Sequence, residues 1–207
     1  NFVSASPDGV CKMWDARYSG EPSVYGTAPN AFFAQQLKEL TPARMLLPGD
    51  GEGRNAAHAA AMGWSVRSFD ASQVGVQKSV ALALERGVTI EAEMGDCRTW
   101  APGESFDAIG LFYLHLLPHV RPSFHQLAAT WLKPGGTLLL EGFGPGQLAF
   151  DSGGPKNLDM LFTEDMLRGD FAGLDVAYCE TVDVVLNEGP YHQGRAEVTR
   201  LVACRPA

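Results

Sequence analysis

The sequence predicts an α/β protein with a doubly wound parallel sheet and helices on both of its faces. Strand-like runs alternate with helix-like runs from residue 43 onward, which is typical of a parallel sheet. A glycine-rich turn, Gly49-Asp50-Gly51-Glu52-Gly53, lies where the first strand should pass into a helix. Two β-rich runs, 174–186 and 196–204, have no helical stretch between them, so they should form a hairpin whose last strand is antiparallel to the sheet.

The individual elements follow from local patterns. Residues 43–47 form a short apolar run, and the Ala-rich segment after the glycine turn favours a helix. Ser72 can cap a later helix, and Gly87 can end it. After the first strand, the elements expected are a helix over 55–62, a strand over 64–69, a helix over 73–85, a strand over 88–92, a strand over 106–112, a helix over 122–132 and a strand over 137–140.

Length and composition indicate one domain over residues 1–207, with an aromatic N-terminal segment over 1–33 and an α/β core over 43–207. Hydrophobic residues make up 45% and charged residues 19%, as is ordinary for a folded soluble protein. The net charge of −8 disfavours a nucleic-acid partner, because a phosphate backbone requires a basic surface. No apolar run approaches the roughly 18 residues that a membrane helix needs.

The cysteines favour a reduced, cytoplasmic protein. They form no C-x-x-C pair, and no histidine lies at zinc-ligand spacing from them, so we expect no metal site. The four are Cys11, Cys97, Cys179 and Cys204.

Several motifs resemble, in order and spacing, those of class I S-adenosylmethionine-dependent methyltransferases. They are Gly49-x-Gly51-x-Gly53, Asp70, Gly95-Asp96, Phe106-Asp107 and Leu132-Lys133-Pro134-Gly135-Gly136. The resemblance implies a seven-stranded Rossmann-like sheet in the order 3-2-1-4-5-7-6 with strand 7 antiparallel. It also implies an enzyme whose cofactor is S-adenosylmethionine.

Smaller features resemble particular groups within that class. The Gly51-Glu52-Gly53-Arg54-Asn55 run is similar to the small tellurite-resistance-type methyltransferases, and Pro48 is similar to the thiopurine-type enzymes. Arg54 stands where a dinucleotide fingerprint requires its third glycine, which disfavours a nicotinamide-dependent oxidoreductase. No Gly-Lys-Ser/Thr follows the turn, which excludes a P-loop.

The resemblance implies a cofactor site at the carboxyl ends of the strands, with the glycine turn against the methionine portion. Asp70 would accept hydrogen bonds from both ribose hydroxyls; the alternative is that it caps the N-terminus of a helix. Asp96 would receive the adenine amino group, or else complete a turn. Leu47 stands where the family usually has an acidic residue. Either Asp50 replaces that acidic residue from a neighbouring position, or the glycine loop binds the cofactor more weakly. The expected cofactor-binding residues are Gly49, Asp50, Gly51, Gly53, Asn55, Asp70, Ala71, Asp96, Cys97, Phe112, Trp14, Tyr18 and Tyr25.

The aromatic residues Trp14, Tyr18 and Tyr25 are expected ahead of the first helix. The resemblance favours a lid that folds over the cofactor and excludes water. The alternative is that these rings seal an edge of the sheet.

Methyl transfer requires an in-line approach to the methyl group, and it requires a general base only when the acceptor arrives protonated. His115 is the first catalytic candidate because it follows the fourth strand by three residues, although a histidine there can equally be structural. The other candidates are Tyr113, His119, Glu141, Tyr191 and His192.

The expected function is methyl transfer to a small-molecule acceptor, such as a thiol, a chalcogen or a similar small nucleophile. The alternative is a regulatory protein that binds S-adenosylmethionine without catalysis. No pattern in the sequence specifies the acceptor or an oligomeric state.

Overall fold

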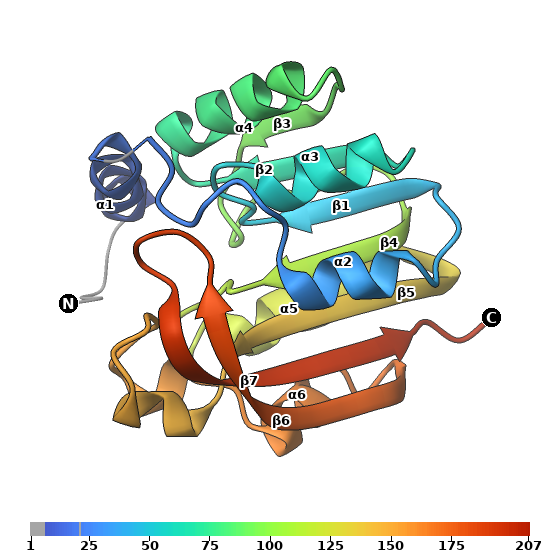
Figure 1. The fold of residues 1–207 in the computed structure, drawn as a ribbon. Helices are drawn as coiled ribbons and strands as arrows, with labels where there is room; N and C mark the ends of the chain where they lie inside the picture. The colour runs from blue at the N-terminus through green and yellow to red at the C-terminus, as the bar shows by residue number, and fades with distance from the viewer. Residues whose placement is uncertain (1–6, 21) are drawn as a thin grey trace.

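The computed structural model describes residues 7–20 and 22–207; residues 1–6 and 21 of the expected N-terminal lid lie outside the described residues. Its centre is a seven-stranded sheet in the order β3-β2-β1-β4-β5-β7-β6 (Figure 1). The first five strands pair in parallel, whereas β7 is antiparallel to both of its neighbours. The predicted fold class and strand order are therefore confirmed. The strands are β1 (Arg44–Pro48), β2 (Ser65–Asp70), β3 (Glu91–Met94), β4 (Phe106–Phe112), β5 (Leu132–Phe143), β6 (Asp175–Asn187) and β7 (Gln193–Cys204).

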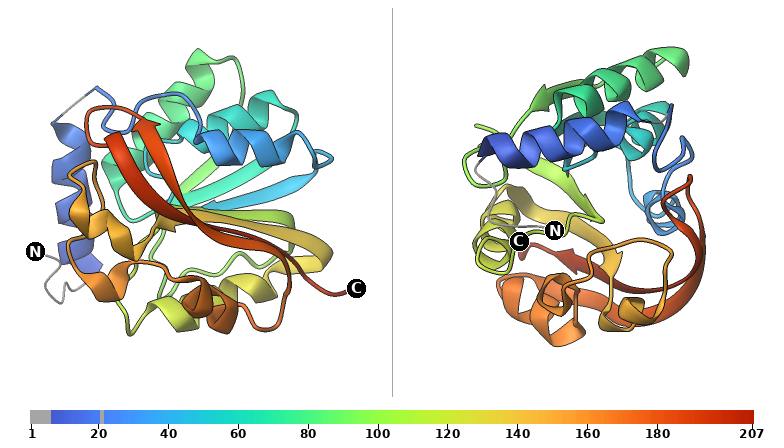
Figure 2. Two further views of the ribbon diagram at one scale, coloured as in Figure 1. Left: turned by 60° about the horizontal axis from the view of Figure 1, so that its bottom comes forward. Right: turned by 90° about the vertical axis from the view of Figure 1, so that its left-hand side faces the viewer.

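Helices cover both faces of the sheet (Figure 2). Ser72 caps one of them as predicted, because its Oγ accepts a hydrogen bond from the Gly75 backbone N–H at 2.9 Å. No helix in the described part of the chain is long and apolar enough to cross a membrane. The helices are α1 (Pro7–Ser19), α2 (Ala31–Leu37), α3 (Arg54–Ala61), α4 (Gln73–Glu85), α5 (Arg121–Thr130) and α6 (Glu164–Asp170), with 3-10 helices over Pro145–Ala149 and Leu158–Met160.

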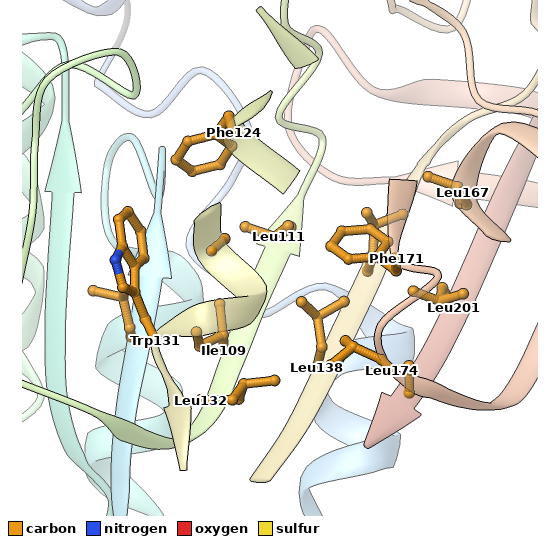
Figure 3. Close-up of a cluster of buried hydrophobic side chains, with 14 of the residues drawn as sticks. Ile109, Leu111, Phe124, Trp131, Leu132, Leu138, Leu167, Phe171, Leu174 and Leu201 are labelled. Atoms are coloured by element: carbon orange, nitrogen blue, oxygen red, sulfur yellow. The ribbon is translucent and has the colours of Figure 1, made fainter. Parts of the chain in front are cut away.

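The core has two sides because successive side chains of a strand point to opposite faces. In β1, Leu46 belongs to a cluster with side chains of α5 and α6, whereas Met45 and Leu47 belong to a cluster with side chains of α2 and α3. Figure 3 shows the first cluster, in which Phe124 of α5 and Phe171 after α6 cover the middle of the sheet. The middle strands β1, β4 and β5 are thus mostly buried on both faces, which leaves their ends as the place where a ligand can reach them.

The third strand begins later than predicted, at Glu91 instead of residue 88. Val88 and Ile90 pack against Ala57 and Leu82, which belong to α3 and α4. The apolar run that suggested a strand therefore covers a helix pair, and the strand itself is the polar segment that follows.

The N-terminal segment is more helical than predicted. Trp14 and Tyr18 lie inside α1, and a second helix, α2, precedes β1. Asn30 begins α2, since its side chain accepts a hydrogen bond from the Phe33 backbone N–H at 2.9 Å. The expectation that these rings come before the first helix is wrong. Only Tyr25 lies between helices.

Candidate functional site

A cavity of about 450 Å³ lies at the carboxyl ends of β1, β2 and β4, the edge where open α/β sheets bind ligands. Two further segments help to cover it: residues 22–30, here called the strap, and residues 187–193, here called the hairpin turn. In Figures 1 and 2 the tip of the β6–β7 hairpin lies beside the chain that joins α1 to α2. The predicted cofactor-binding residues that line the cavity are Trp14, Tyr18, Tyr25, Gly49, Asp50, Gly51, Asn55, Asp70, Ala71, Asp96, Cys97 and Phe112.

Gly53 is the predicted site residue that does not line this cavity. Its φ is 83°, and a Cβ there would lie 2.6 Å from the Ser79 Cα in α4. Gly53 therefore permits the close approach of α3 and α4. Gly51, by contrast, lines the cavity with a φ of 58°, and a Cβ there would collide with the Tyr18 hydroxyl. Only glycine fits easily at either position.

Asp70 ends β2 and is a buried residue, 8% exposed. Its Oδ2 accepts a hydrogen bond from the Gly51 N–H at 2.9 Å, and its Oδ1 accepts one from the Ser72 N–H at 2.9 Å. Burial raises the pKa of Asp70 to about 6. An ionised carboxylate has about four acceptor positions, so two remain for a pair of hydroxyl donors. The alternative role as a helix cap is wrong, because Ser72 caps α4.

Asp50 is the carboxylate that the glycine turn itself presents to the cavity. It accepts a hydrogen bond from the Ala56 N–H at 3.2 Å, and its removal from bulk water raises its pKa to about 8. Leu47, at the position of the family's acidic residue, is buried in the core beside Phe112. A cation placed against Asp50 would favour its ionised form.

The turn after β3 closes another part of the cavity. Asp96 accepts hydrogen bonds at Oδ1 from the backbone N–H and Nε of Arg98 at 2.8 and 2.9 Å. The Arg98 guanidinium holds the pKa of Asp96 below its usual value. Burial raises the pKa of the Cys97 thiol, which therefore stays neutral. The Asp96 carboxylate is thus ionised and already paired with Arg98.

His115 lines the cavity, but both of its ring nitrogens are occupied. Nδ1 lies 2.7 Å from the Met160 carbonyl oxygen, and Nε2 accepts a hydrogen bond from the Phe143 N–H at 3.0 Å. These two contacts require the Nδ1-protonated tautomer. Burial lowers the pKa of His115 to about 4. We therefore assign it a structural role, which is the alternative that the sequence left open.

Four rings form a continuous surface at the other end of the cavity. His192 lies at the centre of this aromatic wall, with ring centroids 4.5 Å from Tyr25, 4.6 Å from Tyr113 and 5.2 Å from Phe143. Tyr113 and Phe143 are themselves 4.8 Å apart. The sequence marked three of these residues, whereas Phe143 lies beyond the strand that was predicted over 137–140 and carried no signal.

The remaining catalytic candidates occupy different surroundings. His119 does not line the cavity, and Tyr191 is 42% exposed beside it. Glu141 is buried behind the aromatic wall, where it accepts a hydrogen bond from the Tyr113 hydroxyl at 3.0 Å. Tyr113 and His192 are the two candidates that line the cavity besides His115.

Two polar residues near the glycine turn hold the strap, and the sequence analysis gave neither of them that role. Glu52 accepts hydrogen bonds from the Val24 N–H at 2.8 Å and from Lys78 Nζ at 2.9 Å. The Asn55 side chain accepts one from the Asn30 N–H at 2.9 Å. Asn55 was expected to bind the cofactor, but its oxygen holds the strap.

Arg54 holds the hairpin turn in the same way. Its Nη2 lies 2.9 Å from Glu188 Oε2, and both side chains are largely buried. Gly26 of the strap and Gly189 of the hairpin turn meet directly, since a Cβ on Gly26 would lie 3.2 Å from the Gly189 nitrogen. The glycine turn, the strap and the hairpin turn are therefore joined around one cavity.

Comparison with known proteins agrees with this geometry. Residues 46–136 match the family model described as a methyltransferase domain. No curated protein matches the sequence. Residues 46–136 thus match a methyltransferase domain, and the sheet that contains them has the class I strand order that the resemblance implied. The cofactor that such a domain implies is S-adenosylmethionine. This match favours methyl transfer over the nicotinamide-dependent alternative.

Solved structures share the fold over most of the chain. A protein that converts a disulfide bond into a thioacetal group during echinomycin biosynthesis has a TM-score of 0.79 at 17% identity, covering 95% of this chain and 92% of that one. TehB from Haemophilus influenzae has a TM-score of 0.72 at 17% identity, covering 86% of this chain and 63% of that one. The N-methyltransferase NodS from Bradyrhizobium japonicum, in complex with S-adenosyl-L-homocysteine, has a TM-score of 0.72 at 12% identity, covering 96% and 99%. At these identities the likeness is one of fold.

Proposed function

We propose that this chain transfers the methyl group of S-adenosylmethionine to a small-molecule acceptor by in-line displacement. The acceptor atom that we propose is a thiol sulfur, a chalcogen or a similar small nucleophile. One observation carries the proposal: the glycine turn with Asp70 and the aromatic wall line the same covered cavity. We call these two regions the cofactor half and the acceptor half.

The residues of the cofactor half suit the cofactor in chemistry. Asp70 retains two acceptor positions for the ribose hydroxyls, and Asp50 offers a carboxylate to the ammonium group of the methionine portion. A Cβ on Gly49 would collide with Leu114, and a Cβ on Gly51 would collide with the Tyr18 hydroxyl, so the turn can lie this close to the cavity only with glycine at both positions. When bound, the cofactor supplies a methyl group on a sulfonium sulfur that leaves as a neutral thioether.

The cover over the cavity supports an acceptor of small size. The strap contacts the hairpin turn at Gly26 and Gly189, and Tyr25 lies against His192 with ring centroids 4.5 Å apart. A cover of this kind limits the access of water to the methyl group, which favours transfer over hydrolysis. A macromolecular acceptor would have to displace both segments.

Two measurements test this function. Calorimetry with S-adenosylhomocysteine should show binding, and a panel of small thiols, selenols and amines should show acceptor-dependent release of S-adenosylhomocysteine from S-adenosylmethionine. The Asp70→Asn variant keeps the shape of the side chain and removes its charge, so it tests whether binding depends on the carboxylate. Binding with no product from any acceptor would favour the regulatory alternative, and absence of binding would contradict both.

A further inference from the structure

Tyr113 has an unusual backbone conformation at the point where β4 enters the cavity. Its φ is 53°, and it is the non-glycine residue with positive φ in the described part of the chain. A bulky side chain in this left-handed region is strained, and such residues persist where their surroundings over-determine them, often at active sites. The strained backbone therefore directs attention to what the Tyr113 side chain does.

The Tyr113 hydroxyl is tied to a buried carboxylate. It donates a hydrogen bond to Glu141 Oε1 at 3.0 Å, and Glu141 is 1% exposed. Arg200 Nε donates to Glu141 Oε2 at 2.6 Å, and Asn30 Nδ2 donates to Oε1 at 2.6 Å. Because its proton is already directed at Glu141, the oxygen of Tyr113 has only acceptor lone pairs left to offer another group.

Tyr113 and Glu141 belong to two different cavities. Tyr113 lines the 450 Å³ cavity, whereas Glu141 lines a second cavity of about 400 Å³ between the strap, Arg200 and the hairpin turn. Tyr25 and Gly26 line both and separate them. The Tyr113–Glu141 hydrogen bond thus connects the acceptor half with a space outside the covered cavity.

We propose that Tyr113 and Glu141 carry the acceptor's proton out of the covered cavity, an inference that rests on the proposed methyl transfer. The acceptor's X–H proton passes to the Tyr113 oxygen while the Tyr113 proton passes to Glu141 Oε1. At the same time the X–C bond forms and the C–S bond breaks, with its electron pair remaining on sulfur. Glu141 then releases the proton to water in the second cavity, and Tyr113 is neutral before and after the step.

The charges around Tyr113 fit a group that stays protonated. Burial, and next the charges of Glu141 and Glu188, raise the pKa of Tyr113 well above its usual value, while Arg54 acts in the opposite direction. A tyrosine that does not ionise can pass on a proton without storing a charge in the covered cavity.

The neighbouring histidine is a less suitable base. Its Nδ1 lies 3.4 Å from Glu188 Oε2, longer than a usual N–H···O hydrogen bond, and that carboxylate already pairs with Arg54. Burial lowers the pKa of His192. His192 nevertheless lines the same cavity as Tyr113, so it is the competing base that the test must separate from Tyr113.

The test compares wild type with Tyr113→Phe, which removes the hydroxyl and keeps the ring, using benzyl mercaptan as acceptor from pH 6 to 10. At pH 7, where this thiol is protonated, Tyr113→Phe should lower kcat by about 100-fold or more. The deficit should shrink as pH rises and vanish once the thiol is ionised. Glu141→Gln should show the same pH-shaped deficit. The dissociation constant for S-adenosylhomocysteine should equal that of wild type in both variants.

Three outcomes would overturn the proposal. A Tyr113→Phe deficit that is equal at every pH would mean that the hydroxyl only maintains packing. Full activity in Tyr113→Phe, with a pH-shaped deficit in His192→Gln, would assign the base to His192. If wild type binds S-adenosylhomocysteine but methylates no thiol, the proposed function fails for this acceptor class and the proton path fails with it.

Discussion

The cofactor half and the acceptor half of the cavity are assembled in different ways. In the cofactor half, Asp70 and Gly51 are bonded across 19 positions of sequence, within one strand–helix–strand unit. In the acceptor half, Arg54 and Glu188 pair across 134 positions, and Asn30 and Glu141 across 111. The first half is a local consequence of a glycine turn, whereas the second exists only after distant segments meet.

The two halves are nevertheless joined at the glycine turn. Glu52 and Asn55 hold the strap from this turn, and Arg54 holds the hairpin turn. Glu52, Arg54 and Asn55 thus hold the segments that cover the acceptor half, while two glycines of the turn line the cofactor half together with Asp50 and Asp70. One short motif can therefore position both ligands through different atoms, and separate substitutions can test each role.

The largest effect should come from Arg54→Met. Removing one partner of a buried ion pair leaves the Glu188 carboxylate without its cation and should lower the free energy of unfolding by about 3–5 kcal/mol, measured by urea denaturation. Arg195→Met is the matched control in the same hairpin, because the Arg195–Asp183 pair is 3.7 Å long with side chains 70% and 67% exposed. It should cost less than about 1 kcal/mol. Equal losses would show that Arg54 does not fasten the hairpin turn.

Asp70→Ala should act on the cofactor half alone. Loss of hydrogen bonds to a charged group should weaken S-adenosylhomocysteine binding by roughly 1.5–3 kcal/mol, which calorimetry measures as about a 10- to 150-fold rise in the dissociation constant. Asp151→Ala, at a fully exposed position, should leave the affinity as in wild type. Unchanged affinity in Asp70→Ala would refute the ribose contact.

Glu52→Ala should release the strap while leaving Asp70, Asp50 and the glycines of the turn in place. The Val24 N–H and Lys78 would lose a buried acceptor, at a cost of about 1–3 kcal/mol in the free energy of unfolding. Chymotrypsin should then cut after Tyr25 faster than in wild type. Glu85→Ala, on the exposed surface of α4, is the control and should resist cleavage as wild type does. If both variants were cut at the same rate, Glu52 would not hold the strap.

The smallest effect concerns pH. Asp50 has a pKa raised to about 8, so it is mostly neutral at pH 7, and a bound ammonium group favours its ionised form. The ionised fraction rises from about one tenth at pH 7 to about one half at pH 8, so affinity for S-adenosylhomocysteine should rise about fivefold. Calorimetry in two buffers should detect proton release on binding. Asp50→Asn should show a flatter profile; an unchanged profile would place the ammonium group elsewhere.

The sequence predicted the fold closely because its strand and helix signals are local. The cap at Ser72 and the terminal hairpin appear where their residue types required them. The third strand was misplaced because Val88 and Ile90 pack on helices, and an apolar run does not reveal which surface it covers. Likewise α1 has no pattern strong enough to predict a helix, since much of its stabilisation comes from contacts with α4.

The predictions for the site also succeeded where they depended on local patterns and failed where they depended on distant segments. Apart from Gly53, the predicted cofactor residues line the cavity, because glycine spacing and a strand-end carboxylate fix local backbone geometry. His115 was ranked first by its position, yet the Met160 carbonyl and the Phe143 amide, which occupy its nitrogens, come from other segments. Sequence position cannot reveal which atoms of a side chain are already bonded.

Local patterns in the sequence were thus enough to predict the class of fold, and its family resemblance implied the strand order and the cofactor. The fold class depends on hydrophobic periodicity, glycine conformations and capping, all of which act within a few residues. Only the tertiary structure decided that Glu52 and Arg54 hold the cover, that His115 is structural and that Tyr113 is bonded to Glu141. Such contacts join segments up to 134 residues apart, and their geometry exists only once the sheet has brought the segments together.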